Sequence, residues 1–297
     1  MEKKRIMVTG GTGYIGSSLL PALLMHNFEV AALVRQTSDI SHIPQNIHKY
    51  YYNKNPQEIK FAFEKFQPQV VVHLASTYDE SCSLEQVNEL INVNINYGTL
   101  ILHVMDLVKC RHLIIAGSYW QYDSNNKKNG NTLYATSKSA FELICEYYRR
   151  KNGIVTNTMI LHDVYGECDW RNKFINKAIH SLYDEQIIMA TLGNQYIDLV
   201  HISDVVDAFL VLIKKPHNRT NKKYSISTGR LVKVRYVAEL IERISGKKLN
   251  ISWGSKPYSQ SQIMKPSTIG SKLIGWEAKI KLEFGIRKII EKYKRYE

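Results

Sequence analysis

Apolar and polar residues follow two alternating patterns along the first half of the chain. Short runs of β-branched and other apolar residues are typical of buried strands, and apolar residues repeated every three or four positions are typical of helices packed on one side. The runs predict strands at residues 5–8, 29–34, 46–52, 70–75, 112–116 and 154–161, and the helical repeats fall at 14–25, 56–66, 84–108 and 132–148. Strands that alternate with helices of this length indicate a parallel sheet covered on both faces. We therefore predict an α/β fold built on a doubly wound parallel sheet.

The alternation loosens beyond residue 165, and the chain becomes more basic and less regular from about residue 229. Helices are predicted at 173–183, 203–214, 234–245 and 282–293, with a hairpin-like stretch near Gly193. Most of this half is expected to form a smaller α/β domain that binds the substrate. The predicted boundaries are residues 1–165 plus 196–228 for a nucleotide-binding domain, and 166–195 plus 229–297 for the substrate domain.

The 297 residues carry a formal net charge of +13, and 44% of them are hydrophobic, enough for an ordinary packed core. Lysine and arginine are spread along the chain, so we expect no nucleic-acid partner. No apolar run approaches the roughly 18 residues of a membrane span, and none at the N-terminus precedes a cleavage site. We therefore expect a soluble, cytoplasmic protein without a membrane partner. The four cysteines lack the spacings of a metal site, so no metal is expected.

Residues 8–16 read VTGGTGYIG and place three glycines between the first strand and the first helix. Gly10 permits a tight turn, Gly13 lets the backbone approach a pyrophosphate, and Gly16 lets the helix pack closely on the sheet. The helix N-terminus offers its unpaired N–H groups to the anion. Because the glycines stand between a strand and a helix at the start of an alternating fold, they predict a Rossmann-like dinucleotide site and not merely a structural turn.

Arg35 ends the second predicted strand, where a dinucleotide fold that prefers NAD carries an acidic residue for the ribose 2′-hydroxyl. A guanidinium group at this position can pair with a 2′-phosphate, with Thr37 and Ser38 as helpers. The sequence therefore favours NADPH (NADP+) as the cofactor. Stacking on adenine and exposure to solvent are the alternative interpretations of Arg35.

Tyr134 and Lys138 lie one turn apart on the same face of a predicted helix. A nearby ammonium group favours the phenolate, so this pair suits proton transfer near neutral pH. The spacing alone is weak evidence. Two other pairs with the same spacing, which we interpret as strand-end and helix-surface pairs, are Tyr50/Lys54 and Tyr147/Lys151. Tyr134 differs because it follows the strand that leads to Ser118, a hydroxyl at the edge where α/β sheets bind ligands.

Further short motifs occur in a fixed order along nearly the whole chain. They are Thr9 to Gly16, Val72 to Ala75, Asn94, Ser118 four residues before Tyr122, Tyr134 to Lys138, Asp163 to Gly166, Asp198 to Val205, and Leu273 to Trp276. With these motifs the chain resembles the extended short-chain dehydrogenase/reductase family, and in particular its nucleotide-sugar branch.

The resemblance implies a role for each matching residue. Tyr134 is implied as the general acid, Lys138 as the group that binds the nicotinamide ribose and keeps the pKa of Tyr134 low, and Ser118 as the holder of the reacting oxygen. Asn94 is implied to brace the active-site helix. The implied cofactor-binding residues are Gly10, Gly13, Tyr14, Ile15, Gly16, Arg35, Leu74, Ala75, Tyr134, Lys138 and Val164. The implied substrate-binding residues are Thr77, Tyr119, Asp163, Asn172, Lys173 and Phe174.

Dehydratases of the family carry an Asp-Glu pair just after the active-site Ser or Thr, whereas this chain has Tyr119 and Trp120 there, so dehydration is not expected. The chain is similar to reductases that make CDP-linked 3,6-dideoxyhexoses and to thymidine-diphosphate 4-keto-6-deoxyhexose reductases. With Arg35, this implies NADPH-dependent reduction of a nucleotide-linked sugar at C4, in deoxysugar and O-antigen biosynthesis. An epimerase that retains NAD, and a non-catalytic module that senses dinucleotides or binds nucleic acid, are the alternatives. We expect a homodimer that acts on a nucleotide-diphosphate sugar.

Three positions depart from the family pattern where many relatives carry an arginine that contacts the substrate's diphosphate. They are Ile160, Ile197 and Ser259. Lys173, Lys256 and Lys265 are candidates to supply the missing charge. The nucleotide, the stereochemistry at C4 and the presence of a 3-hydroxyl group stay open at this point.

Overall fold

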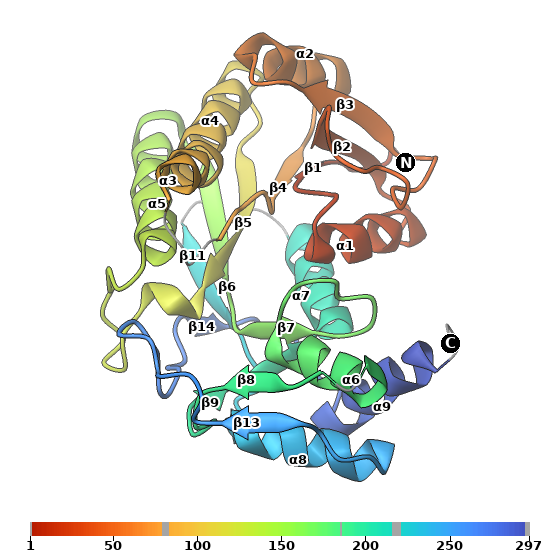
Figure 1. The fold of residues 1–297 in the computed structure, drawn as a ribbon. Helices are drawn as coiled ribbons and strands as arrows, with labels where there is room; N and C mark the ends of the chain where they lie inside the picture. The colour runs from red at the N-terminus through yellow and green to blue at the C-terminus, as the bar shows by residue number, and fades with distance from the viewer. Residues whose placement is uncertain (1, 79–82, 185, 216–220, 295–297) are drawn as a thin grey trace.

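The computed structural model describes residues 2–78, 83–184, 186–215 and 221–294. Its central feature is an eight-stranded sheet in which all neighbouring strands run parallel (Figure 1). From one edge to the other the strands are β14 (Ser271–Lys272), β11 (Lys222–Ile226), β6 (Val155–Leu161), β5 (His112–Ser118), β4 (Val70–His73), β1 (Arg5–Thr9), β2 (Glu29–Arg35) and β3 (His48–Tyr52). The predicted doubly wound α/β fold is confirmed.

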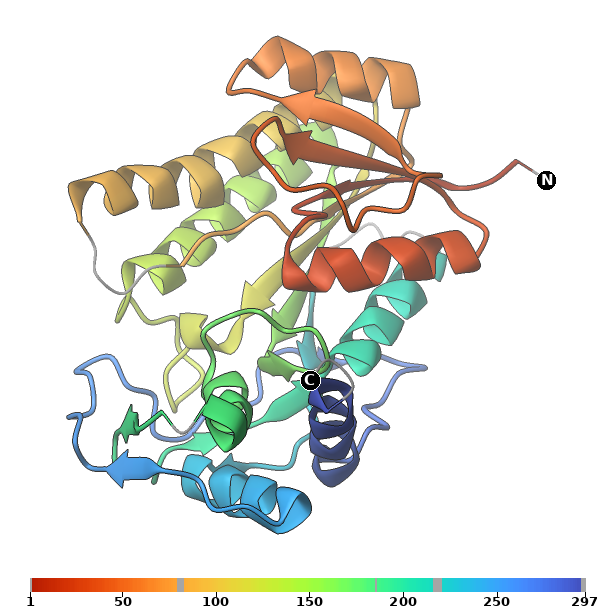
Figure 2. The ribbon, with the colours of Figure 1, turned by 45° about the vertical axis from the view of Figure 1, so that its right-hand side comes forward.

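Helices cover both faces of this sheet, and Figure 2 shows them above and below its edge. One face carries α1 (Tyr14–Met25) and α7 (Ile202–Lys214), and the other carries α2 (Pro56–Phe66), α4 (Gly98–Leu107) and α5 (Leu133–Asn152). Successive residues of a strand point to opposite faces. Ile6 and Val8 of β1 therefore join the core under α1, while Met7 joins the core under α2. Within the described ranges, none of the helices has the length and apolar character that a membrane crossing requires.

The C-terminal elements form a third core, at the bottom of Figure 1. Its helices are α6 (Phe174–Asp184), α8 (Val234–Ser245) and α9 (Leu282–Tyr293). Short strand pairs accompany them: β7 (Asp163–Tyr165) with β10 (Leu199–His201), β8 (Ile188–Ala190) with β13 (Ile251–Trp253), and β9 (Tyr196–Ile197) with β12 (Val232–Lys233). The two-domain division with the boundaries given above stays a prediction.

The hairpin predicted near Gly193 is wrong. The strands on either side of it, β8 and β9, pair with β13 and β12 and not with each other. Gly193 has a φ of +69°, and a Cβ there would lie 2.4 Å from the ring of Trp253. The turn therefore packs against a tryptophan that is 60 positions away in the sequence, a contact that local sequence does not reveal.

The single helix predicted over residues 84–108 is also wrong in part. The structure has α3 (Leu84–Ile91), a π-helical segment (Asn92–Tyr97) and then α4. Such wide turns are frequent at functional sites, and this one carries the buried Asn94. Gly98 then lets α4 approach α5, since a Cβ there would lie 2.5 Å from the ring of Phe141. A π-helical segment of six residues is too short to show an apolar period of its own, so the pattern does not separate it from the α-helices around it.

The carboxyl ends of β1, β4 and β5 meet at one edge of the sheet, because neighbouring parallel strands point the same way. The glycine-rich turn follows β1, Leu74 follows β4, and Ser118 ends β5. Ligands of open α/β sheets bind at this edge. The fold thus gathers the predicted cofactor and catalytic residues in one place.

Candidate active site

Close backbone contacts shape the glycine-rich turn between β1 and α1. Gly10 has a φ of +69°, and a Cβ there would lie 2.5 Å from the backbone nitrogen of Ala75 and 2.7 Å from the carbonyl carbon of Leu74. A Cβ on Gly16 would lie 2.3 Å from the carbonyl oxygen of Gly10. Gly13 differs, because its φ of −79° suits any residue and a Cβ there would meet only the carbonyl oxygen of Gly10, in a tight contact of 3.3 Å. Packing therefore restricts positions 10 and 16 far more strongly than position 13.

The start of α1 fits the pyrophosphate of a dinucleotide. In the described part of the chain no side chain caps this helix, so its first N–H groups are left for another acceptor. Such a helix start attracts phosphate groups. Tyr14 and Ile15 form the first turn, where Tyr14 is buried and Ile15 packs on the core. Gly13 lies where a cofactor would approach, which accounts for a glycine that packing does not need.

Two alanine variants separate packing from cofactor binding in this turn. Gly16→Ala is expected to lower the free energy of unfolding by about 1–3 kcal/mol, because the methyl group would meet fixed backbone. Gly13→Ala is expected to leave stability nearly unchanged and to weaken dinucleotide binding. Thermal unfolding and cofactor titration of both variants measure the contrast. Equal stability of the two proteins would contradict the packing role of Gly16.

Arg35 lies at the end of β2, beside the strand that leads into the glycine-rich turn. Its side chain is 67% exposed, and its guanidinium group lies 3.6 Å from the carboxylate of Glu89 on α3. The guanidinium group is therefore accessible to a ligand, and Glu89 competes for it.

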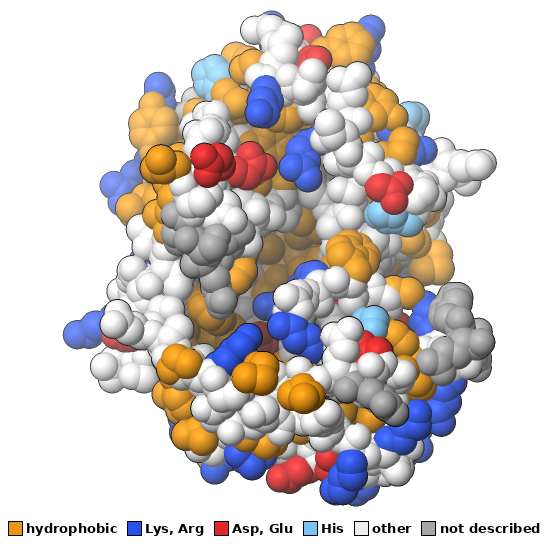
Figure 3. Space-filling model, viewed as in Figure 1, with side chains coloured by type: hydrophobic (Ala, Val, Ile, Leu, Met, Phe, Trp, Pro, Cys, Tyr) orange, Lys and Arg blue, Asp and Glu red, His pale blue; other side chains and the backbone are white. Residues whose placement is uncertain are grey.

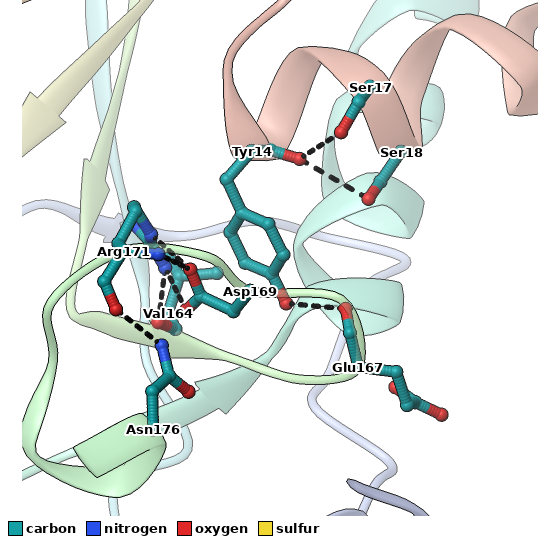
Figure 4. A network of polar contacts seen from close by, with 8 residues as sticks. All are labelled: Tyr14, Ser17, Ser18, Val164, Glu167, Asp169, Arg171 and Asn176. Atoms are coloured by element: carbon teal, nitrogen blue, oxygen red, sulfur yellow. Dashed lines mark hydrogen bonds and ion pairs between the residues drawn. The ribbon is translucent and has the colours of Figure 1, made fainter. Parts of the chain in front are cut away.

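A loop from the second half of the chain holds Tyr14 in place (Figure 4). The guanidinium group of Arg171 lies over the Tyr14 ring, 4.4 Å from its centroid, and binds the buried carboxylate of Asp169 at 2.7 and 2.8 Å. Arg171 also donates to the carbonyl oxygen of Val164 at 2.8 Å. The hydroxyl of Tyr14 donates to the carbonyl oxygen of Glu167 at 3.4 Å. The loop thus connects two predicted cofactor residues, Tyr14 and Val164, through an ion pair that the sequence does not identify.

Ser118, Tyr134 and Lys138 come together at the carboxyl edge of the sheet. Ser118 is the last residue of β5, and the other two lie in the first turns of α5. Thr132 caps this helix by accepting a hydrogen bond from the nitrogen of Ala135 at 3.0 Å. The Nζ of Lys138 lies 5.7 Å from the centroid of the Tyr134 ring. The predicted triad is therefore assembled by one strand end and one capped helix.

Burial dominates the ionisation of the Tyr134/Lys138 pair. It raises the pKa of Tyr134, although hydrogen bonds with Ser118 and Ser76 and the charge of Arg171 act in the opposite direction. Burial lowers the pKa of Lys138 to about 8. The expectation that Lys138 keeps the pKa of Tyr134 low is wrong here, because the cost of burying a phenolate exceeds the effect of nearby charge. Tyr134 therefore carries its proton at neutral pH.

Asn94 links the π-helical segment to α5 and to the chain that follows β4. Its Oδ1 accepts from the hydroxyl of Ser76 at 3.0 Å and from the nitrogen of Thr77 at 2.9 Å. Its Nδ2 donates to the carbonyl oxygen of Thr77 at 3.0 Å and to the hydroxyl of Ser137 at 3.1 Å. Ser137 in turn donates to the carbonyl oxygen of Tyr134 at 2.8 Å. This is the geometry that a brace of the active-site helix requires, and it fixes the main chain of Thr77.

Tyr119 and Asp163, both predicted to contact substrate, contact each other. The hydroxyl of Tyr119 donates to Oδ2 of Asp163 at 3.0 Å, and the ring stacks on His162 at 5.0 Å between centroids. Burial raises the pKa of Asp163 and the pKa of Tyr119. His162 is 5% exposed, and neither ring nitrogen has a hydrogen-bond partner among the described residues. The sequence does not predict His162 as a site residue, since a histidine at the end of an apolar strand is usually a core residue.

The other predicted substrate residues lie at the start of α6. Asn172 and Lys173 are exposed, and the charge of Lys173 lowers the pKa of Asp163. Phe174 begins the helix and packs on the third core, with its ring 6.0 Å from that of Trp253. Figure 3 shows a hollow between the sheet and the C-terminal elements, with basic side chains along its lower edge. Phe174 is therefore a packing residue, whereas Asn172 and Lys173 are available to a ligand.

The positions where relatives carry diphosphate-binding arginines have no charged side chain here. Ile160 is fully buried in the core, Ile197 is half-buried in β9, and the hydroxyl of Ser259 lies 3.0 Å from that of Ser261. Among the residues that the structure describes, no group of three or more side chains forms a metal-binding cluster.

Comparison with known proteins identifies the family. Residues 6–227 match the NAD dependent epimerase/dehydratase family. The chain belongs to this family. Its resemblance to the nucleotide-sugar branch of the extended short-chain dehydrogenases is thereby confirmed. The family depends on nicotinamide dinucleotides, and this chain is one of its enzymes.

Proteins similar to this family member differ in the reaction that they catalyse. A CDP-abequose synthase of Yersinia pseudotuberculosis is 29% identical over 264 residues, which are 88% of this chain and 91% of the relative. A dTDP-D-glucose 4,6-dehydratase of Mus musculus is 25% identical in an alignment of 323 positions, gaps included, that covers 98% of this chain and 89% of the relative. A UDP-glucose 4-epimerase from Thermotoga maritima, solved with UDP-glucose, has a TM-score of 0.86 at 22% identity, over 98% of this chain and 99% of that one. The epimerase shares the fold, and the site residues have to decide the reaction.

Proposed function

We propose that this protein reduces the C4 keto group of a nucleotide-activated 4-keto-6-deoxy sugar with NADPH. The observation that carries the proposal is the pair of residues after Ser118. Elimination of water needs an acid and a base at the sugar, and the chain has Tyr119 and Trp120 there, while Ser118, Tyr134 and Lys138 are all present. The similarity to CDP-abequose synthases supports a deoxysugar substrate.

The cofactor, when bound, supplies a hydride for the carbonyl carbon. Tyr134 donates its proton to the carbonyl oxygen, so that together with the hydride the ketone becomes a hydroxyl group. Ser118 donates a hydrogen bond to the same oxygen and orients it toward Tyr134. Lys138 holds the nicotinamide ribose. Because burial raises the pKa of Tyr134, this group carries its proton at neutral pH, as a general acid must before the step.

The cofactor and substrate contacts follow from the same site. Arg35 is proposed to bind the 2′-phosphate of NADPH. Asp163 and Lys173 are proposed to contact the sugar and the diphosphate, and Asn172 and Thr77 to complete the substrate site. We also propose that the protein acts as a homodimer and that its product is used in deoxysugar and O-antigen biosynthesis.

The proposal is tested by incubating the purified protein with NADPH and enzymatically prepared CDP- or dTDP-linked 4-keto-6-deoxy sugars. We expect loss of absorbance of the reduced cofactor, with one 4-hydroxy sugar formed per NADPH consumed. The same substrates with NADH provide the cofactor control.

Two other outcomes would contradict the proposal. Interconversion of nucleotide sugars with a retained NAD and no net consumption of reduced cofactor would identify an epimerase. Dinucleotide or nucleic-acid binding without any turnover would identify a non-catalytic module.

A further inference from the structure

The carboxylate of Glu142 is buried on α5, one helical turn beyond Lys138, with its side chain 8% exposed. It accepts from the Nζ of Lys128 at 2.8 Å and from the Nζ of Lys223 at 2.6 Å. These two lysines come from a loop and from β11, far apart in the sequence. Burial opposes the charge, but the two lysines hold the pKa of Glu142 below its ordinary value. Glu142 is therefore a permanent negative charge inside the protein at neutral pH.

This carboxylate is connected to Ser118 through one side chain. The Nε2 of Gln121 donates to Oε1 of Glu142 at 3.1 Å, and Oε1 of Gln121 accepts from the backbone nitrogen of Ser118 at 2.9 Å. Gln121 is fully buried, so its amide has little freedom to turn. Glu142 and Ser118 favour the same orientation of that amide, because a carboxylate only accepts hydrogen bonds and a backbone N–H only donates them.

Glu142 is also a neighbour of Lys138. Both line a small internal cavity of about 10 Å³, together with Gln121, Asn94 and His73, and such a space holds about one water molecule. The groups that face Lys138 are Tyr134 and Glu142 on α5 and His73 on β4. Burial and the charge of Lys138 lower the pKa of His73 to about 3, so this ring is neutral. Of these groups, Glu142 alone is anionic at neutral pH.

We propose that Glu142 is a positioning residue of this active site, which keeps the ammonium group of Lys138 charged and holds Gln121 in the orientation that fixes Ser118. The inference rests on the proposed function only where it assigns catalytic roles to Lys138 and Ser118. The contacts of Glu142 are present in the protein without substrate.

The sign of the expected effect follows from the charges. Burial lowers the pKa of Lys138 to about 8, and the carboxylate of Glu142 raises it. Without this carboxylate, three ammonium groups share the region with no counter-ion from Glu142. Lys128 and Lys223 are partly exposed and can turn to water, whereas Lys138 donates to the carbonyl oxygen of Ala116 inside the site. Lys138 is therefore the group that loses its proton more easily.

The test is an NMR titration of the full-length protein labelled with [13Cε]lysine, in which the Lys138 signal is assigned by its absence from Lys138→Arg. We expect Glu142→Gln to lower the pKa of Lys138 by about 1 unit. Glu142→Asp keeps the negative charge on a side chain that is one carbon shorter. The pKa of Lys138 in this variant should therefore lie between its values in the natural protein and in Glu142→Gln. In turnover measurements, the alkaline limb of kcat should move to lower pH in the same order.

Glu146→Gln is the matched control. Glu146 lies one turn further along α5 and also binds two cations, Arg149 and Arg150 at 2.7 and 2.8 Å, but its side chain is 31% exposed and does not line the cavity beside Lys138. The Glu146→Gln variant is expected to leave the pKa of Lys138 unchanged. Should Glu142→Gln not fold, the comparison of Glu142→Asp with the natural protein decides the matter.

An unchanged pKa of Lys138 in folded Glu142→Gln or Glu142→Asp would overturn the inference. The titration needs no substrate, so it separates this inference from the proposed function. A shifted pKa of Lys138 in a protein that reduces no keto sugar would contradict the proposed function and support the inference about Glu142. Turnover of keto sugars with an unshifted pKa of Lys138 would support the proposed function and contradict the inference.

Discussion

Replacing Tyr134 with phenylalanine is expected to lower kcat by roughly 10²–10⁴-fold while the affinity for NADPH stays nearly unchanged. The variant loses the hydroxyl that supplies the proton and keeps the ring that packs beside Lys138. Turnover of a 4-keto sugar and fluorescence titration with NADPH measure the two quantities. Because α5 keeps its cap at Thr132, the fold is expected to survive the change.

Tyr147→Phe is the matched control for this variant. Tyr147 has the same spacing to a lysine on the same helix, and its hydroxyl accepts from the Nζ of Lys151 at 3.0 Å. It is exposed and stands away from the sheet edge, so kcat should not change. An active Tyr134→Phe variant would show that the proton comes from another group.

Replacing Arg35 with aspartate is expected to shift the preference from NADPH toward NADH by roughly 1–3 kcal/mol, the range of a hydrogen bond to a charged group. The new carboxylate repels a 2′-phosphate and accepts a hydrogen bond from a 2′-hydroxyl. The ratio of kcat/KM for the two cofactors measures the shift. An unchanged ratio would remove Arg35 from cofactor recognition.

Glu89→Gln complements this experiment. Because Glu89 pairs with Arg35 at 3.6 Å, its removal should tighten the binding of NADPH and leave the binding of NADH nearly unchanged. Equal effects on both cofactors would indicate that Glu89 acts on the fold and not on the 2′-phosphate.

Local patterns were sufficient for the sheet, the glycine-rich turn and the triad. Each depends on residues close in sequence: the run that forms a strand, the glycines at 10 and 16, and the one-turn spacing of Tyr134 and Lys138. The rule that parallel strands end at one edge then brings these pieces together. The same rule also separates Tyr134 from Tyr147, which has the same spacing to a lysine but lies on an exposed helix face.

The supporting contacts were not predictable in the same way. Glu142 meets Lys223, and Arg171 lies over Tyr14, through contacts between residues 81 and 157 positions apart. No periodicity encodes such pairs. The direction of the Tyr134 pKa was missed for a related reason, since burial is a property of the folded protein.

At the π-helical segment between α3 and α4, the number of residues matters as well as the identity of Asn94. Each helical residue advances the chain by about 100°. Deleting one residue between α3 and Asn94 would rotate Asn94 away from Ser76 and Ser137, even with its own side chain intact. A gene for this protein should therefore tolerate base substitutions at the other positions of this stretch far better than the loss or gain of a single codon.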